Sequence, residues 1–254
     1  MTFYKYQGTG NDFIMIDGRQ EIPSWSQQYI EKLCHRRFGI GADGLIILAK
    51  EPGFDFRMIY FNSDGRESTM CGNGGRCIAQ FAHDLGLGDR FHFMAIDGPH
   101  QAIVTNESVQ LQMGDVAKIN PQGEDYFADT GSPHHVQFRA EIENLEIITE
   151  ARAIRNHPPY KVAGVNVNFI SGEGSQWSMR TYERGVEDET YSCGTGVTAA
   201  ALVAHHHQGA QSPIEMKTKG GHLKLSFEHH PDKGYFNIWL QGPAKKVFEG
   251  KLND

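Results

Sequence analysis

A repeated segment is the feature of this 254-residue chain that most constrains its fold. Residues 60–74 align without gaps to residues 182–196, at an offset of 122 residues, which is close to half the chain length. A tyrosine, a glutamate, a cysteine and two glycines coincide, and both copies end in Cys-Gly-x-Gly. Self-similarity at a fixed spacing is typical of a duplicated unit. We therefore expect two halves of similar architecture, related by pseudo-symmetry.

Strand patterns dominate the rest of the sequence. Apolar and polar side chains alternate over residues 54–60 and 108–113, which is the period of a strand with one buried face. The same alternation stands on both sides of the turn segment at residues 229–234 and predicts a hairpin. Antiparallel pairing is therefore the simpler explanation for most of the strands.

Helical patterns are fewer. Ser24 and Gln27 resemble a capping box before an apolar stripe that Gly39 can close, and a weaker helical period runs from Leu145 to Arg155. Small-residue helical stretches follow both Cys-Gly-x-Gly segments, over residues 76–87 and 197–207. No long linker interrupts the chain, so we place the boundary at a tight crossover around residues 114–121. The predicted domains are residues 1–115 and 116–243, and the last strand, residues 244–254, could join the first.

Composition excludes several classes of function. The chain has 24 Lys and Arg against 31 Asp and Glu, a net charge of −7 with no basic cluster, which argues against nucleic acid or an anionic membrane as a partner. Its apolar stretches are far shorter than the roughly 20 residues that span a bilayer. The amino terminus has no secretion signal, so we expect a cytoplasmic location in which the four cysteines stay as thiols.

Cys71 and Cys193 occupy matching places in the repeat and are the predicted catalytic residues. If each Cys-Gly-x-Gly begins a helix, the unpaired amides of the first turn would attract a carboxylate and favour thiolate over thiol. Two such cysteines, one from each half, could face each other across a cleft. The thiolate would remove a proton from the carbon beside the carboxylate, and the opposite thiol would deliver one to the other face. This arrangement suits stereoinversion.

The remaining cysteines and a histidine run have simpler interpretations. Cys34 and Cys77 are interpreted as small buried apolar residues. Cys71 and Cys77 lack the short spacing of usual zinc ligands, and the run His205–His207 is interpreted as an exposed helix end. We therefore expect no metal site.

Eight segments, in their order and spacing, resemble the diaminopimelate epimerase family over nearly the whole chain. They are residues 10–13, 39–44, 61–65, 71–77, 131–134, 165–167, 183–185 and 193–196. The resemblance implies an α/β (α+β) fold of two pseudo-symmetric domains, each a mainly antiparallel sheet or barrel around a central helix. It implies cofactor-independent interconversion of LL- and meso-diaminopimelate, in lysine and peptidoglycan precursor biosynthesis. It also implies a homodimer that closes its cleft around this small-molecule substrate.

The resemblance also implies roles for individual residues. Cys71 and Cys193 are similar to the two proton-transfer residues. The matches to the backbone clamps on the reacting carboxylate are Gly72, Asn73, Gly194 and Thr195. The matches to the substrate-holding residues are Asn11, Asn62, Asn166, Glu183 and Arg184. His134 and Glu183 match residues that modulate the pKa values of the thiols. Ser132 stands where many members have asparagine, and we do not assign it to the site.

Three other functions stay open at this point. A proline or hydroxyproline racemase-type enzyme would share the thiol pair, but the asparagines and Arg184 favour a substrate with a second charged end. A hydrolase could use Cys193 and His134 as a nucleophilic dyad, which leaves the second cysteine unexplained. A non-catalytic amino-acid-binding protein would not need either thiol.

Overall fold

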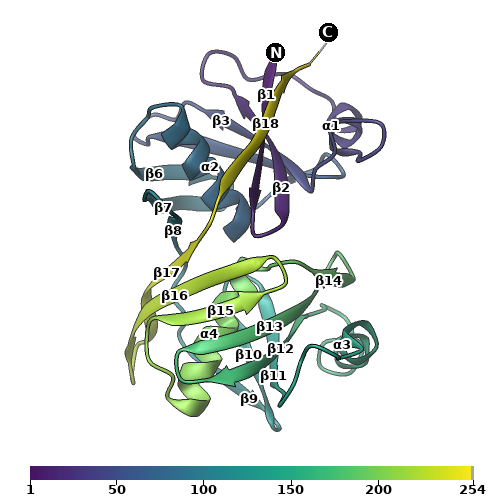
Figure 1. Cartoon of the computed structure of the whole chain (residues 1–254), viewed down its shortest axis with the longest axis vertical. Coiled ribbons are helices and arrows are strands. Elements are labelled where there is room, and N and C mark those ends of the chain that lie inside the picture. Colours follow the sequence, from purple (N-terminus) through teal and green to yellow (C-terminus); the bar gives the residue numbers. More distant parts are fainter. Residues whose placement is uncertain (253–254) are drawn as a thin grey trace. The chain divides into compact units, whose positions relative to one another are not determined.

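The computed structural model describes residues 1–252, and its contacts divide the chain into two compact units. Unit 1 comprises Met1–Leu111 and the chain from Gly242 onward, and unit 2 comprises Gln112–Gln241. In each unit a mainly antiparallel sheet packs around one central helix (Figure 1). None of the helices within residues 1–252 is both long enough and apolar enough to cross a bilayer.

Unit 1 contains nine strands and two helices among its described residues. The strands are β1 (Thr2–Gly8), β2 (Asn11–Asp17), β3 (Gly44–Ala49), β4 (Phe56–Asn62), β5 (Glu67–Ser68), β6 (Arg90–Ala95), β7 (Gly98–Val104), β8 (Val109–Gln112) and β18 (Lys245–Lys251). The helices are α1 (Gln27–Cys34) and α2 (Gly72–Asp84). Strand β18 pairs with β1, so the end of the chain completes the sheet that its beginning starts.

Unit 2 also contains nine strands and two helices. The strands are β9 (Asn120–Gln122), β10 (Asp125–Asp129), β11 (Pro133–Phe138), β12 (Asn166–Glu173), β13 (Gln176–Glu183), β14 (Asp188–Thr190), β15 (Ile214–Thr218), β16 (Gly221–His230) and β17 (Gly234–Gly242). The helices are α3 (Ile147–Arg155) and α4 (Gly194–Gln208). The predicted hairpin is confirmed as β16 and β17, and the predicted helix near residues 145–155 is confirmed as α3.

The two units repeat the same order of elements and the same pairing directions. Strands β1 to β8 correspond to β10 to β17, with α1 and α3 before the third strand and α2 and α4 after the fifth. In both series the second strand pairs parallel with the third, and the fourth pairs parallel with the sixth. The other pairs are antiparallel. The duplication predicted from 15 residues thus extends through the topology of both units.

Most residues of both central helices are buried, and the sequence of α4 is apolar on nearly every side. In α4 every residue from Val197 to Ala204 is buried, which is typical of a helix enclosed in a core. Both helices begin directly after the repeated cysteine, three or four residues earlier than the helical pattern predicted. The pattern missed this first turn because glycine is a poor helix former.

Helix α1 corrects one local prediction. Ser26, not Ser24, caps the helix, and its Oγ accepts a hydrogen bond of 3.3 Å from the Tyr29 amide. The side chain of Gln27 donates to the Asp64 carbonyl instead of completing a capping box. The helix ends at Cys34 and does not reach Gly39. Cys34 and Cys77 are both buried, as predicted, and burial raises the pKa of both thiols.

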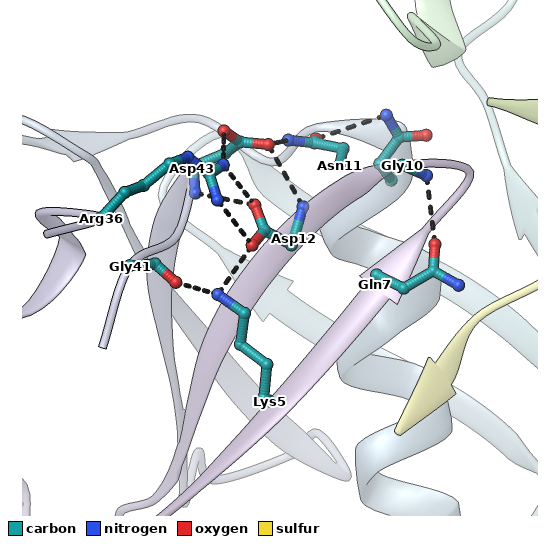
Figure 2. Close-up of polar contacts among 9 residues, drawn as sticks. Lys5, Gln7, Gly10, Asn11, Asp12, Arg36, Gly41 and Asp43 are labelled. Atoms are coloured by element: carbon teal, nitrogen blue, oxygen red, sulfur yellow. Dashed lines mark hydrogen bonds and ion pairs between the residues drawn. The ribbon is translucent and has the colours of Figure 1, made fainter. Parts of the chain in front are cut away.

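A group of four charges connects the first two strands of unit 1 to the loop before β3 (Figure 2), with Lys5 buried, Asp12 and Asp43 half-buried and Arg36 exposed. The carboxylate of Asp12 lies 2.7 Å from Lys5 Nζ and 2.7 Å from Arg36 Nη2. Lys5 also donates to the Gly41 carbonyl, and Arg36 also reaches the carboxylate of Asp43. Burial alone would raise the pKa of Asp12, but the hydrogen bonds from Arg36 and Lys5 lower it to about 2.

Replacing Asp12 tests this group of charges. The pKa of Asp12 is lower in the folded chain than the unfolded value of about 4. Its contribution to stability is therefore fully present above pH 4 and is lost as the pH falls toward 2. We expect Asp12→Asn to lower the free energy of unfolding by about 2 kcal/mol at pH 7 and by nearly nothing at pH 2. Urea unfolding across this range measures it, and Asp64→Asn, which removes a more exposed carboxylate, is the control.

Gly234 and Gly123 form a matched pair for a test of packing. Both have positive φ angles, 78° and 69°, which disfavour any side chain. A Cβ at Gly234 would collide with the carbonyl oxygens of Val116 and Ala117, whereas a Cβ at Gly123 meets nothing within 4 Å. We expect Gly123→Ala to cost about 1 kcal/mol and Gly234→Ala at least 2 kcal/mol more. Thermal unfolding compares them, and equal losses would contradict the packing argument.

Candidate active site

Cys71 is the N-cap residue of α2. Its backbone is extended, with φ −109° and ψ 149°, and its Sγ accepts a hydrogen bond of 3.2 Å from the Gly74 amide. Its carbonyl accepts from the Gly75 amide at 2.8 Å. The first amides of a helix have no partner within the helix and attract negative charge. Hydrogen bonding to sulfur favours the thiolate, so this helix start suits a proton-transfer residue.

Arg76 belongs to α2 itself, four residues after Gly72, and was not predicted as a site residue from the sequence. It is fully buried, and its guanidinium donates to the Gly72 carbonyl at 3.1 Å and to Asn73 Oδ1 at 2.9 Å. Burial lowers the pKa of Arg76 to about 10, so the side chain stays cationic at neutral pH. No carboxylate within residues 1–252 forms an ion pair with it, and its charge is attracted to an ionised Cys71 or Cys77. A buried cation of this kind favours an anion nearby.

A two-residue turn, Thr9-Gly10, joins β1 to β2 and packs against the start of α2. Both residues have positive φ angles, 49° and 87°, as in the turns that fit a twisted hairpin. This conformation is unusual for threonine, and buried hydrogen bonds hold it in place. Thr9 Oγ1 accepts from Arg76 Nη2 at 3.2 Å and donates to Asn73 Oδ1 at 3.4 Å. The turn therefore fixes the backbone from which Asn11 projects.

Asn11 and Asn73 are brought together in unit 1. Asn73 Nδ2 donates to Asn11 Oδ1 at 3.3 Å, and Asn11 Nδ2 donates to Asp43 Oδ2 at 2.6 Å (Figure 2). Asn62 is exposed at the end of β4, and Gly72 is buried in the first turn of α2. The predicted residues of the first half therefore lie on β2, β4 and α2, and Asp43, which was not predicted, orients Asn11.

Cys193 is the N-cap residue of α4 and has the same extended backbone, with φ −120° and ψ 114°. The Val197 amide donates to its carbonyl at 2.9 Å. Its Sγ lies 3.4 Å from Thr195 Oγ1, and Thr195 Oγ1 lies 2.9 Å from His134 Nε2. The threonine hydroxyl thus stands between the thiol and the imidazole. Cys193 and both of its predicted neighbours, Gly194 and Thr195, are at the first turn of a buried helix, as expected.

A second Thr-Gly turn, Thr130-Gly131, joins β10 to β11 in unit 2. Gly131 has a φ of 93°, and Thr130 Oγ1 donates to the Thr195 carbonyl at 2.8 Å. Thr9 and Thr130 therefore both bind the residue two positions after the cysteine of their unit. The offset between the two turns is 121 residues, so this second repeat was visible in the sequence but was missed.

Asn166 links the remaining predicted residues of unit 2. Its Nδ2 donates to Ser132 Oγ at 2.9 Å and to the Pro133 carbonyl at 3.0 Å, and its Oδ1 accepts from the Arg184 amide at 2.8 Å. Ser132, which was not assigned to the site, thus holds Asn166. Arg184 is exposed just after β13 and Glu183 is half-buried at the end of that strand. The side chain of Arg184 also donates to the Ala163 carbonyl at 3.3 Å.

His134 is completely buried on β11. Burial, and secondarily the positive charge of Arg184, lower its pKa to about 3, so the imidazole is neutral at physiological pH. Its Nδ1 lies 3.1 Å from Asn168 Nδ2. Asn168 was not predicted, although it lies two residues after Asn166 on the same strand and therefore on the same face. The sequence signal that could have identified Asn168 is its amide side chain between the apolar residues Val167 and Phe169.

The histidines at the end of α4 are not part of this site. His206 and His207 are exposed and His205 is half-buried, with its Nδ1 2.9 Å from the Ala210 carbonyl. Among residues 1–252, no group of three or more His, Cys, Asp or Glu side chains is placed to hold a metal ion.

Solved structures with the same fold have low sequence identity to the chain. A Bacillus anthracis phenazine biosynthesis protein of the PhzF family superimposes with a TM-score of 0.73 and 13% identity, over 100% of this chain and 99% of that one. A probable proline racemase from Agrobacterium radiobacter, with bound carbonate, has a TM-score of 0.69 and 14% identity, over 99% and 92%. These similarities concern the fold alone.

Sequence comparisons are more specific. The family model for diaminopimelate epimerase matches residues 3–119 and 126–247. A diaminopimelate epimerase of Flavobacterium psychrophilum is 49% identical over 254 residues, which cover 98% of this chain and 99% of the relative. The diaminopimelate epimerase of Chlorobaculum tepidum is 40% identical over 257 residues, covering 96% and 98%. With these matches along nearly its whole length, the chain belongs to the diaminopimelate epimerase family.

Proposed function

We propose that this chain is an isomerase that interconverts LL- and meso-diaminopimelate without a cofactor, with Cys71 and Cys193 as the two proton-transfer residues. The observation that carries the proposal is the duplicated helix start. Each unit places a cysteine as the N-cap of a buried central helix, with glycines in the first turn and a Thr-Gly turn packed against it. A reaction in which one carbon beside a carboxylate loses and regains a proton would use both cysteines.

In this mechanism the carboxylate beside the reacting carbon binds the amides that follow the two cysteines. These amides belong to Gly72, Asn73, Gly194 and Thr195. One cysteine, as thiolate, removes the α-proton, and the negative charge that develops on the carboxylate is stabilised by the helix amides. The other cysteine, as thiol, gives a proton to the opposite face of the carbon. The reverse reaction exchanges the two roles.

The distal end of diaminopimelate is an amino acid, and the proposed residues for it match its charges. Arg184 carries the positive charge for the distal carboxylate, and Glu183 carries the negative charge for the distal ammonium. Asn11, Asn62 and Asn166 supply amide donors and acceptors. Two of these asparagines are already oriented by hydrogen bonds within their own units, Asn11 by Asp43 and Asn166 by Ser132 and Pro133.

Proline racemase-type activity is the second candidate, because the fold and the two cysteines do not distinguish it from diaminopimelate epimerase activity. Arg184 and Glu183 favour a substrate with a second charged end, which proline lacks. Comparing turnover of diaminopimelate with that of proline separates the two reactions. The homodimer and the cytoplasmic location expected from the sequence stay predictions.

Removing either thiol tests the two-cysteine mechanism. We expect Cys71→Ala and Cys193→Ala each to lower kcat/KM by about 10³-fold or more, because each removes the general acid in one direction and the general base in the other. Cys77→Ala is the matched control, since Cys77 is fully buried in α2 and should affect thermal stability but not turnover. Full activity in either of the first two variants would refute the mechanism.

Solvent isotope incorporation tests the same mechanism without mutation. When LL-diaminopimelate is converted in heavy water, we expect the first meso product to carry deuterium at the inverted α-carbon while the remaining LL substrate is still unlabelled. The proton that is added comes from the thiol opposite the one that removes a proton. Mass spectrometry of both isomers at low conversion measures this, and product that keeps its original proton would argue for a single base.

A further inference from the structure

A series of hydrogen bonds leads from Asn168 through His134 and Thr195 to Cys193. The donor and acceptor of each bond follow from the orientation of the Asn168 amide. Asn168 Nδ2 lies 3.0 Å from the His135 carbonyl and 3.1 Å from His134 Nδ1. A carbonyl oxygen can only accept, so the nitrogen of the Asn168 amide must face it. Thr181 Oγ1 donates to Asn168 Oδ1 at 3.0 Å, which agrees with this orientation.

The orientation of this amide determines the tautomer of His134. Because Asn168 donates to Nδ1, that nitrogen must carry a lone pair, and the proton of the neutral imidazole is on Nε2. Asn166 Nδ2 is also within 3.5 Å of Nε2, but it has shorter contacts with Ser132 Oγ and the Pro133 carbonyl, which use both of its hydrogens. Nε2–H therefore donates to Thr195 Oγ1, 2.9 Å away.

The direction of this bond leaves the hydroxyl proton of Thr195 for Cys193. An oxygen that accepts from Nε2–H has its own hydrogen available, and Cys193 Sγ lies 3.4 Å away. A hydrogen bond to sulfur from a donor favours the thiolate. If His134 had the other tautomer, the hydroxyl would donate to the imidazole and would offer only lone pairs to the sulfur.

We propose that Asn168 is a positioning residue that holds His134 as its Nε2–H tautomer and thereby directs the Thr195 hydroxyl proton to Cys193, which favours the thiolate form of that residue. The packing fits this role, since a Cβ on Gly196 would lie only 2.8 Å from Asn168 Oδ1 in the first turn of α4. Burial keeps His134 neutral, with Arg184 as the charged group acting on it. The inference deepens the proposed role of Cys193 and rests on it.

Nitrogen-15 NMR of histidine-labelled protein tests the tautomer directly. At pH 7 we expect His134, identified by the loss of its signals in a His134→Gln variant, to show a protonated Nε2 and an unprotonated Nδ1. In Asn168→Leu, a change of similar size that removes the donor, we expect Nδ1 to become partly protonated. A wild-type His134 with its proton on Nδ1 would overturn the inference, whether or not Asn168→Leu folds.

The state of the thiol is tested by the pH profile of Cys193 alkylation by iodoacetamide, read by peptide mass spectrometry in a Cys71→Ala background. We expect the midpoint of the profile to rise by about one pH unit in Thr195→Val, which removes the hydroxyl, and by less in Asn168→Leu. The double variant should equal Thr195→Val, because both changes interrupt one chain. Thr198→Val is the matched control, since the hydroxyl of Thr198 lies in the same helix but donates to the Gly194 carbonyl.

Two outcomes of the alkylation experiment would contradict the inference. One is a pH midpoint of Cys193 alkylation in Thr195→Val that equals the wild-type midpoint. The other is a shift in the double variant that equals the sum of the shifts in the two single variants. Neither readout needs substrate or turnover, so failure of this inference is distinguishable from failure of the proposed function. If the meso product carried no deuterium while the His134 tautomer and the alkylation midpoints were as expected, the inferred hydrogen bonds would be supported. The proposed reaction would then be contradicted.

Discussion

The first turn of a buried helix leaves amide groups that the helix itself does not satisfy, and the site depends on how this chain satisfies them. Serine, threonine, aspartate or asparagine usually cap such a turn. Here the N-cap of both central helices is a cysteine, whose neutral sulfur is a weak acceptor. An ionised sulfur or a bound anion would therefore satisfy these helix starts better than a neutral thiol does. Glycines in the first turn let sulfur, amides and an incoming group approach closely, as the contact distances at Gly74 and Gly196 indicate.

The two units share a scaffold but surround their cysteines with different groups. In both, a Thr-Gly turn binds the residue two positions after the cysteine. Behind Cys71 lies the buried cation of Arg76, whereas near Cys193 lies the neutral imidazole of His134. A charge and a dipolar hydrogen-bond chain can both favour a thiolate, but they differ in strength and in dependence on salt. The duplication therefore supplies the same backbone geometry twice and two unlike electrostatic environments.

Sequence reasoning identified what repeats along the chain. The Cys-Gly-x-Gly echo predicted the duplicated units and a helix near each cysteine, and alternation predicted the β16–β17 hairpin. It missed partners that meet only through tertiary contacts. Arg76 reaches Thr9 across 67 residues, and Asn168 reaches His134 across 34. Neither pairing has a periodic signal, since the first depends on which turn packs against α2 and the second on the pairing of β11 with β12. The cap of α1 was misplaced because Ser24 and Ser26 are both acceptable caps, and local sequence does not choose between them.

The unlike surroundings of the two cysteines have a consequence for a reaction that inverts one carbon. Such a reaction needs one thiolate and one thiol at the same time, and two identical cysteines in identical environments would divide the protons without preference. In the proposed mechanism, the buried guanidinium near Cys71 and the hydrogen-bond chain near Cys193 break this equivalence before substrate binds. The proposed mechanism requires this bias to be small, because the reverse reaction needs the opposite assignment and a large bias would slow one direction. A neutral His134, which acts on Cys193 only through the hydroxyl of Thr195 and adds no charge, is suited to a small bias.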